Sequence, residues 1–427
     1  MFADTTHKYY REQYFDIASA EEGASALAST SKAGVRDTDR PLIVQFCANS
    51  PEHLLTAAKL VQDHCDAVDI NLGCPQEIAR RGHYGAFLME EWDLVYNMSP
   101  VNTLHKNLSV PVTAKFRVFD DVERTVAYAQ MLERAGAQIL TCHGRTREQR
   151  GQNSGLASYA HIRAVRAAVR VPLIANGNIL FSSDVARCLK ETGCDAVMSA
   201  EGVLYNPALF NGLQPSPGET DLELTLDITN PPLAPLALEY LDIVRSQRTR
   251  TSPSAVKGHL FKILRPALAQ PKHHDLREKL GRVKVDAPRR VAEGEQWVWV
   301  DEYVRICEEL AARLEADAKD LTKDGTIPLR ELITKDAAMG LDVLPYWLSQ
   351  PYFRPLKSPV AKKDKAGKQG KAKETAATAG AGAAVLEEAE KGLDLPVKRP
   401  SCATEANDGD EVEAKRVKLD VAAAVAA

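Results

Sequence analysis

The chain has 427 residues, 44% of them hydrophobic and 26% charged, with a formal net charge of −4. No apolar run reaches the roughly 18 residues that a membrane-spanning helix needs, and the polar N-terminus lacks the apolar core of a signal peptide, so we expect a soluble, intracellular protein with no membrane partner. The eight cysteines include no C-x-x-C pair, which argues against a zinc knuckle or an iron–sulfur cluster and predicts no metal site.

Six short apolar runs alternate with amphipathic helices between residues 41 and 210. The runs are rich in Val and Ile and are apolar on both faces, which is typical of strands in a buried parallel sheet. They cover residues 42–47, 67–72, 110–116, 138–142, 171–175 and 196–199. Ser50 and Asp121 are expected to cap the helices that follow them, and Gly193 to end another. Alternation this regular predicts an α/β fold.

Two α/β architectures compete for these elements. A doubly wound dinucleotide-binding fold requires G-x-G-x-x-G after its first strand, and no such motif follows any run. A (β/α)8 TIM barrel places its chemistry at the carboxyl ends of many strands, and polar or reactive residues follow nearly every run here. They are Gln45, Asn71 to Cys74, Lys115 and Arg117, His143 to Arg145, Asn176 to Asn178, and Ala200 to Gly202. We therefore predict a TIM barrel.

A closed barrel needs eight strands, and residues 1–40 add no convincing strand to the six. Barrel phosphate sites usually lie after strands 7 and 8. If the six runs are strands three to eight, the turns Asn176-Gly177-Asn178 and Ala200-Glu201 lie at that place, and Gly177 lets backbone N–H groups turn towards an anion. We therefore expect a phosphate site there, with a turn that holds no ligand as the alternative, and we expect the first one to two strands to be missing.

The pattern changes near residue 231, where prolines precede a region with helical periodicity and no strands. Helices are predicted over 236–244, 256–268 and 297–314. Residues 245–290 contain 13 Lys and Arg but only three acids, which favours a polyanionic partner over a merely solvated face. The predicted organisation is a remnant of an N-terminal barrel segment (1–40), a barrel catalytic domain (41–230), a helical domain (231–350) and a disordered Lys/Ala-rich tail (351–427).

The most specific motif is Asp69-Ile70-Asn71-Leu72-Gly73-Cys74-Pro75. Gly73 permits a sharp exit from the strand, and Pro75 biases Cys74 towards an extended backbone. The polar loop that follows could carry Cys74 onto a substrate. A single cysteine is more often an unremarkable thiol, which is the alternative at this position.

The motif resembles the D-x-N-x-G-C-P signature of the tRNA-dihydrouridine synthase family. The segments 81–86 and 198–202 also resemble family motifs, the first in the form of the eukaryotic subfamily that acts at tRNA positions 16 and 17. The resemblance covers residues 1 to about 350 and implies an FMN-binding TIM barrel with a C-terminal helical domain that binds tRNA. Family members begin with a further strand, helix and strand, so the resemblance implies that about thirty residues are absent here and that FMN binding is weakened.

The resemblance also implies roles for single residues. Cys74 is the proton donor, and Gln45, Lys115 and His143 contact FMN, whereas a surface lysine and a structural histidine are the alternatives that the residues alone leave open. The turns Asn176-Gly177-Asn178 and Ala200-Glu201 are expected to hold the phosphate of FMN. The residues expected to contact the tRNA substrate are Asn71, Arg117, Arg145, Lys257, Lys262 and Arg265.

The implied activity is FMN-dependent reduction of uridine to 5,6-dihydrouridine in the D-loop of tRNA, with NADPH or NADH as reductant, by a monomer. The alternatives are another FMN-dependent pyrimidine oxidoreductase, which needs no basic helical surface, and a catalytically impaired tRNA-binding homologue. Two basic clusters in the tail, at 398–400 and 415–418, follow a nuclear-import pattern. We therefore expect the protein in the nucleus, the cytoplasm or both.

Overall fold

The computed structural model describes residues 41–352, except for gaps at 93–94, 96–99, 152–154, 212–227, 247–250, 284–297 and 338–339. The predicted N-terminal remnant, the predicted disordered tail and its two basic clusters lie outside the described residues.

Six parallel strands form one sheet in the order in which they occur in the sequence. They are β1 (Ile43–Phe46), β2 (Ala67–Leu72), β3 (Val112–Arg117), β4 (Ile139–His143), β5 (Leu173–Asn176) and β6 (Ala196–Met198). Each strand ends within one or two residues of a predicted run. Parallel neighbours in chain order, joined through helices, are the repeat from which a (β/α)8 barrel is built. The predicted fold class is confirmed, and the number of strands outside the described residues stays a prediction.

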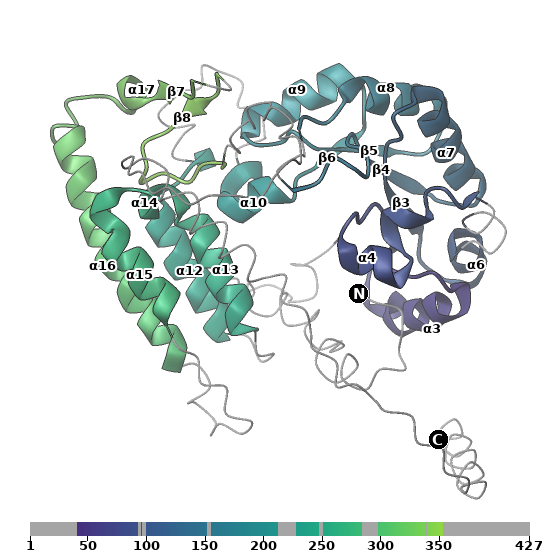
Figure 1. Cartoon of the computed structure of the whole chain (residues 1–427), viewed down its shortest axis with the longest axis horizontal. Coiled ribbons are helices and arrows are strands. Elements are labelled where there is room, and N and C mark those ends of the chain that lie inside the picture. The colour runs from purple at the N-terminus through teal and green to yellow at the C-terminus, as the bar shows by residue number, and fades with distance from the viewer. Residues whose placement is uncertain are drawn as a thin grey trace, which may run out of the picture. The chain divides into compact units, whose positions relative to one another are not determined.

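The connecting helices lie along one side of this curled sheet (Figure 1). The longer ones are α3 (Pro51–Val61), α6 (Pro100–Asn107), α7 (Val122–Arg134), α8 (Tyr159–Ala168) and α9 (Ser182–Thr192). The shorter elements are η1 (Gln62–His64), α4 (Glu77–Gly82), η2 (Gly85–Leu88), α10 (Glu201–Tyr205) and η4 (Pro207–Phe210). The predicted caps are present: Ser50 and Asp121 accept backbone hydrogen bonds at the starts of α3 and α7, and Gly193 ends α9 with φ 70°.

The two faces of the sheet differ in chemistry. Side chains alternate along a strand, and on one face they are apolar and fully buried, as at Phe46, Ile70 and Phe116. On the other face, here called the inner face, the strand register aligns polar side chains in rows. These side chains belong to Gln45, Asp69, Asn71, Thr113, Lys115, Arg117, Thr141, His143 and Asn176. The expectation of strands apolar on both faces was therefore wrong for the inner face.

A second apolar core lies among the helices that follow residue 230. These elements are α12 (Leu233–Ser246), α13 (Pro253–Ile263), α14 (Arg265–Leu268), η5 (Pro271–His273), α15 (His274–Arg282), α16 (Val298–Leu321) and α17 (Leu329–Leu332), with a short antiparallel pair, β7 (Thr334–Lys335) and β8 (Asp342–Val343). Leu241, Leu260 and Leu310 are fully buried in this core. Among the described helices, none is long and apolar enough to span a bilayer.

Two details of this region differ from the sequence-based expectation. The helix predicted over 256–268 is interrupted after Ile263, because Pro266 lacks an N–H and its ring disfavours a continuous helix. The β7–β8 pair was not expected, and strands of two residues are too short to produce a visible alternation.

Candidate active site

A chain of side-chain hydrogen bonds crosses the inner face from β3 to β1 and back to β2. Thr113 Oγ1 donates to Asp69 Oδ1 at 2.5 Å, and Gln45 Nε2 donates to Asp69 Oδ2 at 2.7 Å. Asn71 Nδ2 then donates to Gln45 Oε1 at 2.9 Å. Asp69 is 6% exposed, and burial raises the pKa of its carboxyl, although the two donors favour the ionised form.

This series of hydrogen bonds ends on the backbone of the loop that carries Cys74. Asn71 Oδ1 accepts from the N–H groups of Gly73 and Cys74, both at 3.0 Å. The Cys74 carbonyl accepts from Ala86 N at 3.0 Å. Gly85 has φ 66°, and a Cβ there would lie 2.8 Å from the Cys74 carbonyl oxygen, so the close contact requires glycine. The half-buried Cys74 thiol is thus held at the carboxyl end of β2.

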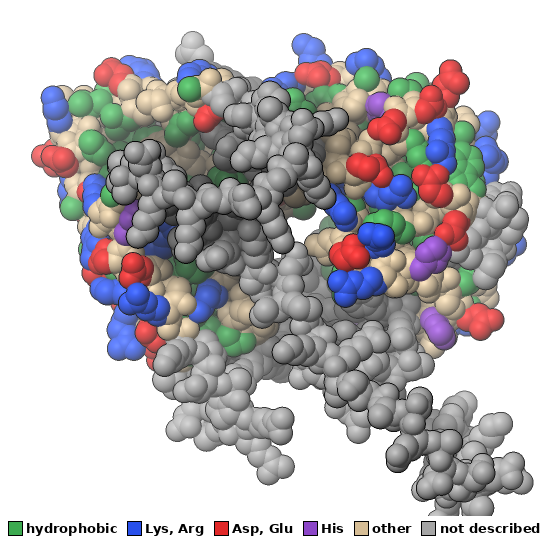
Figure 2. All heavy atoms as spheres, in the orientation of Figure 1, with side chains coloured by type: hydrophobic (Ala, Val, Ile, Leu, Met, Phe, Trp, Pro, Cys, Tyr) green, Lys and Arg blue, Asp and Glu red, His purple; other side chains and the backbone are tan. Residues whose placement is uncertain are grey.

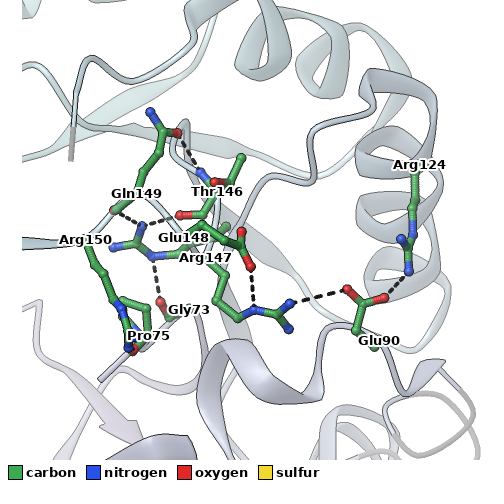
Figure 3. A network of polar contacts seen from close by, with 10 residues as sticks. Gly73, Pro75, Glu90, Arg124, Thr146, Arg147, Glu148, Gln149 and Arg150 are labelled. Atoms are coloured by element: carbon green, nitrogen blue, oxygen red, sulfur yellow. Dashed lines mark hydrogen bonds and ion pairs between the residues drawn. The ribbon is translucent and has the colours of Figure 1, made fainter. Parts of the chain in front are cut away.

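Two arginines hold the carbonyl groups on either side of Cys74 (Figure 3). Arg117 Nε donates to the Gly73 carbonyl at 2.8 Å, and Arg150 Nη1 donates to the Pro75 carbonyl at 2.6 Å. Arg117 Nη1 also donates to the carbonyls of Thr146 and Gln149, at 2.8 and 3.1 Å. The Cys74 loop is therefore joined to the loop after β4.

The loop after β4, residues 144–151, is joined to a third segment through Arg147. Its guanidinium lies 3.0 Å from Glu148 Oε1 and 3.9 Å from Glu90 Oε1. Glu90 also pairs with Arg124 of α7, as Figure 3 shows. These contacts are partly exposed, so solvent weakens each of them.

Lys115 occupies the middle of the inner face. Burial, with a smaller effect from Arg117, lowers the pKa of its ammonium to about 8. No hydrogen bond or ion pair joins its Nζ to any residue in the described part of the chain. A largely buried ammonium without a direct partner is suited to an anionic ligand.

His143 lies beside Arg117 in the register of β3 and β4. Arg145 Nη1 lies 3.1 Å from His143 Nε2, and a guanidinium can only donate, so the Nε2 atom accepts and the ring proton resides on Nδ1. Burial and the nearby Lys115 lower the pKa of His143 strongly, so the ring is neutral. Arg145 also donates to Asn178 Oδ1 at 3.2 Å and to the Gly155 carbonyl at 2.9 Å.

The side chains expected at a phosphate site are largely engaged in local structure. Asn176 Nδ2 donates to the Met198 carbonyl at 2.8 Å. Asn178, with φ 61°, exchanges two hydrogen bonds with the backbone of Ala157 at 2.9 Å. A Cβ at Gly177 would lie 2.6 Å from Ala157 Cβ, so glycine is required there by packing. The backbone groups of this turn are suited to an anion.

The second expected turn follows β6. Ala200 precedes the five-residue helix α10, and the exposed Glu201 is its first residue. Ser199 Oγ donates to the Ile179 carbonyl at 3.1 Å, which joins this turn to the one after β5.

The tRNA-binding residues expected in the helical region lie on α13 and α14, and their contacts differ. Lys257 Nζ donates to the carbonyls of Gly281 and Val283 at 2.9 and 3.1 Å. The Arg265 guanidinium lies 3.3 Å from the ring centre of Tyr352. Lys262 has no hydrogen bond or ion pair with any described residue.

Part of the positive charge counted between residues 245 and 290 is neutralised by acids of α16. The pairs are Arg245 with Asp301, Lys272 with Asp317, and Lys279 with Glu309. Figure 2 shows basic and acidic side chains intermixed on the face of the helical elements, at the left of the view. The sequence window ended before these acids and so overstated the charge asymmetry.

Sequence analysis did not assign roles to Asp69, Thr113 or Arg150. The signal for the first two was present, because polar residues alternate with apolar ones in β2 and β3. Within the described residues, no group of three or more His, Cys, Asp or Glu could hold a metal ion.

Known proteins resemble the chain over most of its length. Residues 17–279 match the family model described as dihydrouridine synthase (Dus). The tRNA-dihydrouridine(16/17) synthase [NAD(P)(+)] of Saccharomyces cerevisiae is 45% identical over 358 residues, which are 82% of this chain and 75% of that protein. A mouse protein named tRNA-dihydrouridine(16/17) synthase [NAD(P)(+)]-like is 45% identical over 79% of this chain and 61% of its own length. The Schizosaccharomyces pombe synthase of the same specificity is 43% identical over 77% of each chain.

Proposed function

The chain belongs to the dihydrouridine synthase family, and from this membership and the site geometry we propose that it reduces uridine to 5,6-dihydrouridine in the D-loop of tRNA, at position 16 or 17. The observation that carries the proposal is the thiol of Cys74, held by Asn71 at the edge of a polar inner face. On that face the Lys115 ammonium makes no hydrogen bond or ion pair with any described residue. The names of the yeast and mouse relatives support NADPH or NADH as the source of reducing equivalents.

The inner face fits FMN as the cofactor. A reduced flavin carries negative charge on its pyrimidine edge, and Lys115 offers a buried positive charge with no other direct partner. The neutral His143 can donate from Nδ1, and Gln45, which donates to Asp69 and accepts from Asn71, lies on the same face. Bound FMN would supply the hydride that is added to C6 of uracil.

The chain's own residues would complete the reduction. The Cys74 thiol would donate its proton to C5, which forms the new C–H bond and leaves a thiolate that regains a proton from water. A thiol is suited to this step because it holds its proton at neutral pH and can still release it. The bonds from Asn71 and Arg117 would hold Cys74 at a constant position during the transfer.

The first prediction concerns Cys74 itself. Cys74→Ala should lower the rate of dihydrouridine formation at least about a hundredfold, the scale of a lost general acid, while flavin content and tRNA affinity stay within about twofold, because the thiol is not needed to hold either ligand. The product is measured by mass spectrometry of nucleosides from tRNA incubated with protein, FMN and NADPH.

Cys47→Ala is the matched control. Cys47 is also half-buried and has a side-chain hydrogen bond with Asn71, but burial raises the pKa of its thiol to about 11. Its replacement should leave activity within about threefold. Full activity of Cys74→Ala would contradict the proposed role of Cys74, and a protein that binds tRNA but no flavin would support a purely RNA-binding function instead.

A further inference from the structure

The buried hydrogen-bond chain on the inner face has one consistent direction. The ionised carboxylate of Asp69 can accept hydrogen bonds but cannot donate them. The Gln45 side chain must therefore turn its Nε2 towards Asp69. Gln45 Oε1 then faces Asn71 and accepts from Nδ2. Asn71 Oδ1 is left to face the backbone N–H groups of Gly73 and Cys74.

The other end of the chain requires the same direction. Backbone N–H groups can only donate, so the loop needs an oxygen from Asn71. An asparagine or glutamine amide can turn either way, and its orientation is set by its partners. Here the Asp69 carboxylate can only accept, and the backbone N–H groups of Gly73 and Cys74 can only donate. Both ends therefore select the same orientation of the Gln45 and Asn71 side chains.

We infer that Asp69 is a positioning residue for Cys74: its carboxylate orients Gln45 and Asn71 and thereby holds the backbone of the Cys74 loop. Asp69 suits this role because it is 6% exposed and its two carboxylate oxygens have separate partners, Gln45 and Thr113. The consequence for catalysis rests on the function proposed above, but the effect on the loop does not.

Substitutions that place a carboxylate at position 45 test the direction of this series of hydrogen bonds. Gln45→Glu places a second acceptor beside Asp69, so the first hydrogen bond is lost. Repulsion between the two carboxylates should move the Glu side chain away from Asn71, which then loses the acceptor that fixes its orientation. The Cys74 loop should open more often, and iodoacetamide should alkylate Cys74 at least about fivefold faster. The rate is followed by mass spectrometry of the peptide that contains Cys74, in the full chain.

Adding Asp69→Asn to Gln45→Glu should reverse this effect. The new amide at position 69 can donate to the new carboxylate at position 45 and still accept from Thr113. The carboxylate accepts from Asn71, so Asn71 Oδ1 faces the loop again. The alkylation rate should return to within about twofold of the rate in the unaltered protein. If the two substitutions acted independently, their effects would add and the double variant would be alkylated faster still.

Thr113→Val is the control, because it removes a bond to Asp69 but leaves the direction of the chain intact. It should change the alkylation rate by less than about twofold. Unchanged alkylation in Gln45→Glu, or no recovery on adding Asp69→Asn, would overturn the inference. If Gln45→Glu alone does not fold, a folded double variant with a normal rate supports the inference, and an unfolded one overturns it.

The proposed function can fail separately. If alkylation follows the expected pattern but the unaltered protein forms no dihydrouridine with FMN, NADPH and tRNA, the positioning role of Asp69 stands and the proposed reaction does not.

Discussion

The charge of Lys115 on the inner face depends on its surroundings. Burial and Arg117 lower its pKa to about 8, and Asp69 opposes them only in part. A lysine is charged below its pKa, so Lys115 is positive at neutral pH and becomes neutral as the pH rises above 8. An anion bound beside it gains attraction only while the ammonium is charged.

We therefore expect FMN affinity to fall as the pH rises through about 8, by up to about tenfold per pH unit for a single ionisation. Lys115→Met should weaken binding below pH 8 and flatten this dependence. Anaerobic equilibrium dialysis of reduced FMN, the form whose pyrimidine edge is anionic, measures both effects between pH 7 and 9.5. Lys59→Met, an exposed lysine on α3, should leave the pH dependence unchanged. If FMN affinity still falls with pH in Lys115→Met, a group other than Lys115 causes the pH dependence.

At the scale of elements, the loop of residues 144–151 determines where the Cys74 loop lies. Arg117, 8% exposed, donates to three backbone carbonyls in the two loops. Arg150 is exposed and makes one such bond. The two arginines therefore make similar contacts at different depths. The sequence-based expectation for Arg117 was contact with flavin or substrate, and the described structure gives its Nε and Nη1 atoms other partners.

The difference in burial predicts a difference in stability. Arg117→Met should lower the free energy of unfolding by about 2–4 kcal/mol, because one buried and two partly buried carbonyls lose their donor. Arg150→Met should cost at most about 1 kcal/mol, because water replaces the exposed bond. Urea unfolding followed by circular dichroism measures both. Equal losses for the two variants would show that burial does not set the cost of these bonds.

At the scale of the whole molecule, a net charge of −4 must be reconciled with a polyanionic substrate. Acids of α16 pair with three basic residues of the described helical region, Arg245, Lys272 and Lys279, and so reduce its positive charge. Lys262 on α13 has no such partner among the described residues and is the strongest candidate for a phosphate contact. We propose that tRNA binds the helical region through residues of this kind.

Salt dependence of tRNA binding tests this proposal. Lys262→Gln should weaken binding and reduce the slope of log affinity against log salt by roughly 0.7–0.9, the release of one counterion. Lys319→Gln on α16, where the lysine is paired with Glu315 at 2.8 Å, should leave the slope unchanged. Filter-binding measurements at several salt concentrations give the slopes. Equal slopes for Lys262→Gln and the unaltered protein would place the phosphate contacts on other residues.

The tail carries a separate prediction, on residues outside the described part of the chain. We propose that the basic clusters at 398–400 and 415–418 direct the protein to the nucleus, because short basic clusters in polar segments are a nuclear-import pattern. Residues 390–427, fused to a fluorescent reporter too large to diffuse through nuclear pores, should move it into the nucleus. Alanine at Lys415, Arg416 and Lys418 should abolish accumulation, and a reporter that stays cytoplasmic would contradict the proposal.

Local patterns in the sequence were sufficient for the elements and for the most specific residue. Apolar runs of strand length, set between segments of helical periodicity, located all six described barrel strands. Ser50 and Asp121 were found as caps because capping acts over three residues. Cys74 was found because its motif is contiguous along the chain.

The tertiary structure alone decided which polar groups meet. Asp69 lies 24 and 44 residues from its partners Gln45 and Thr113, and only the register of three strands brings them together. The bond from Arg150 to the Pro75 carbonyl spans 75 residues and depends on how two loops close. Likewise, the ion pairs of α16 with Lys272 and Lys279 depend on helix packing. Hydrogen bonds and ion pairs act over a few ångströms in space, so sequence spacing cannot assign them once the partners lie on different elements.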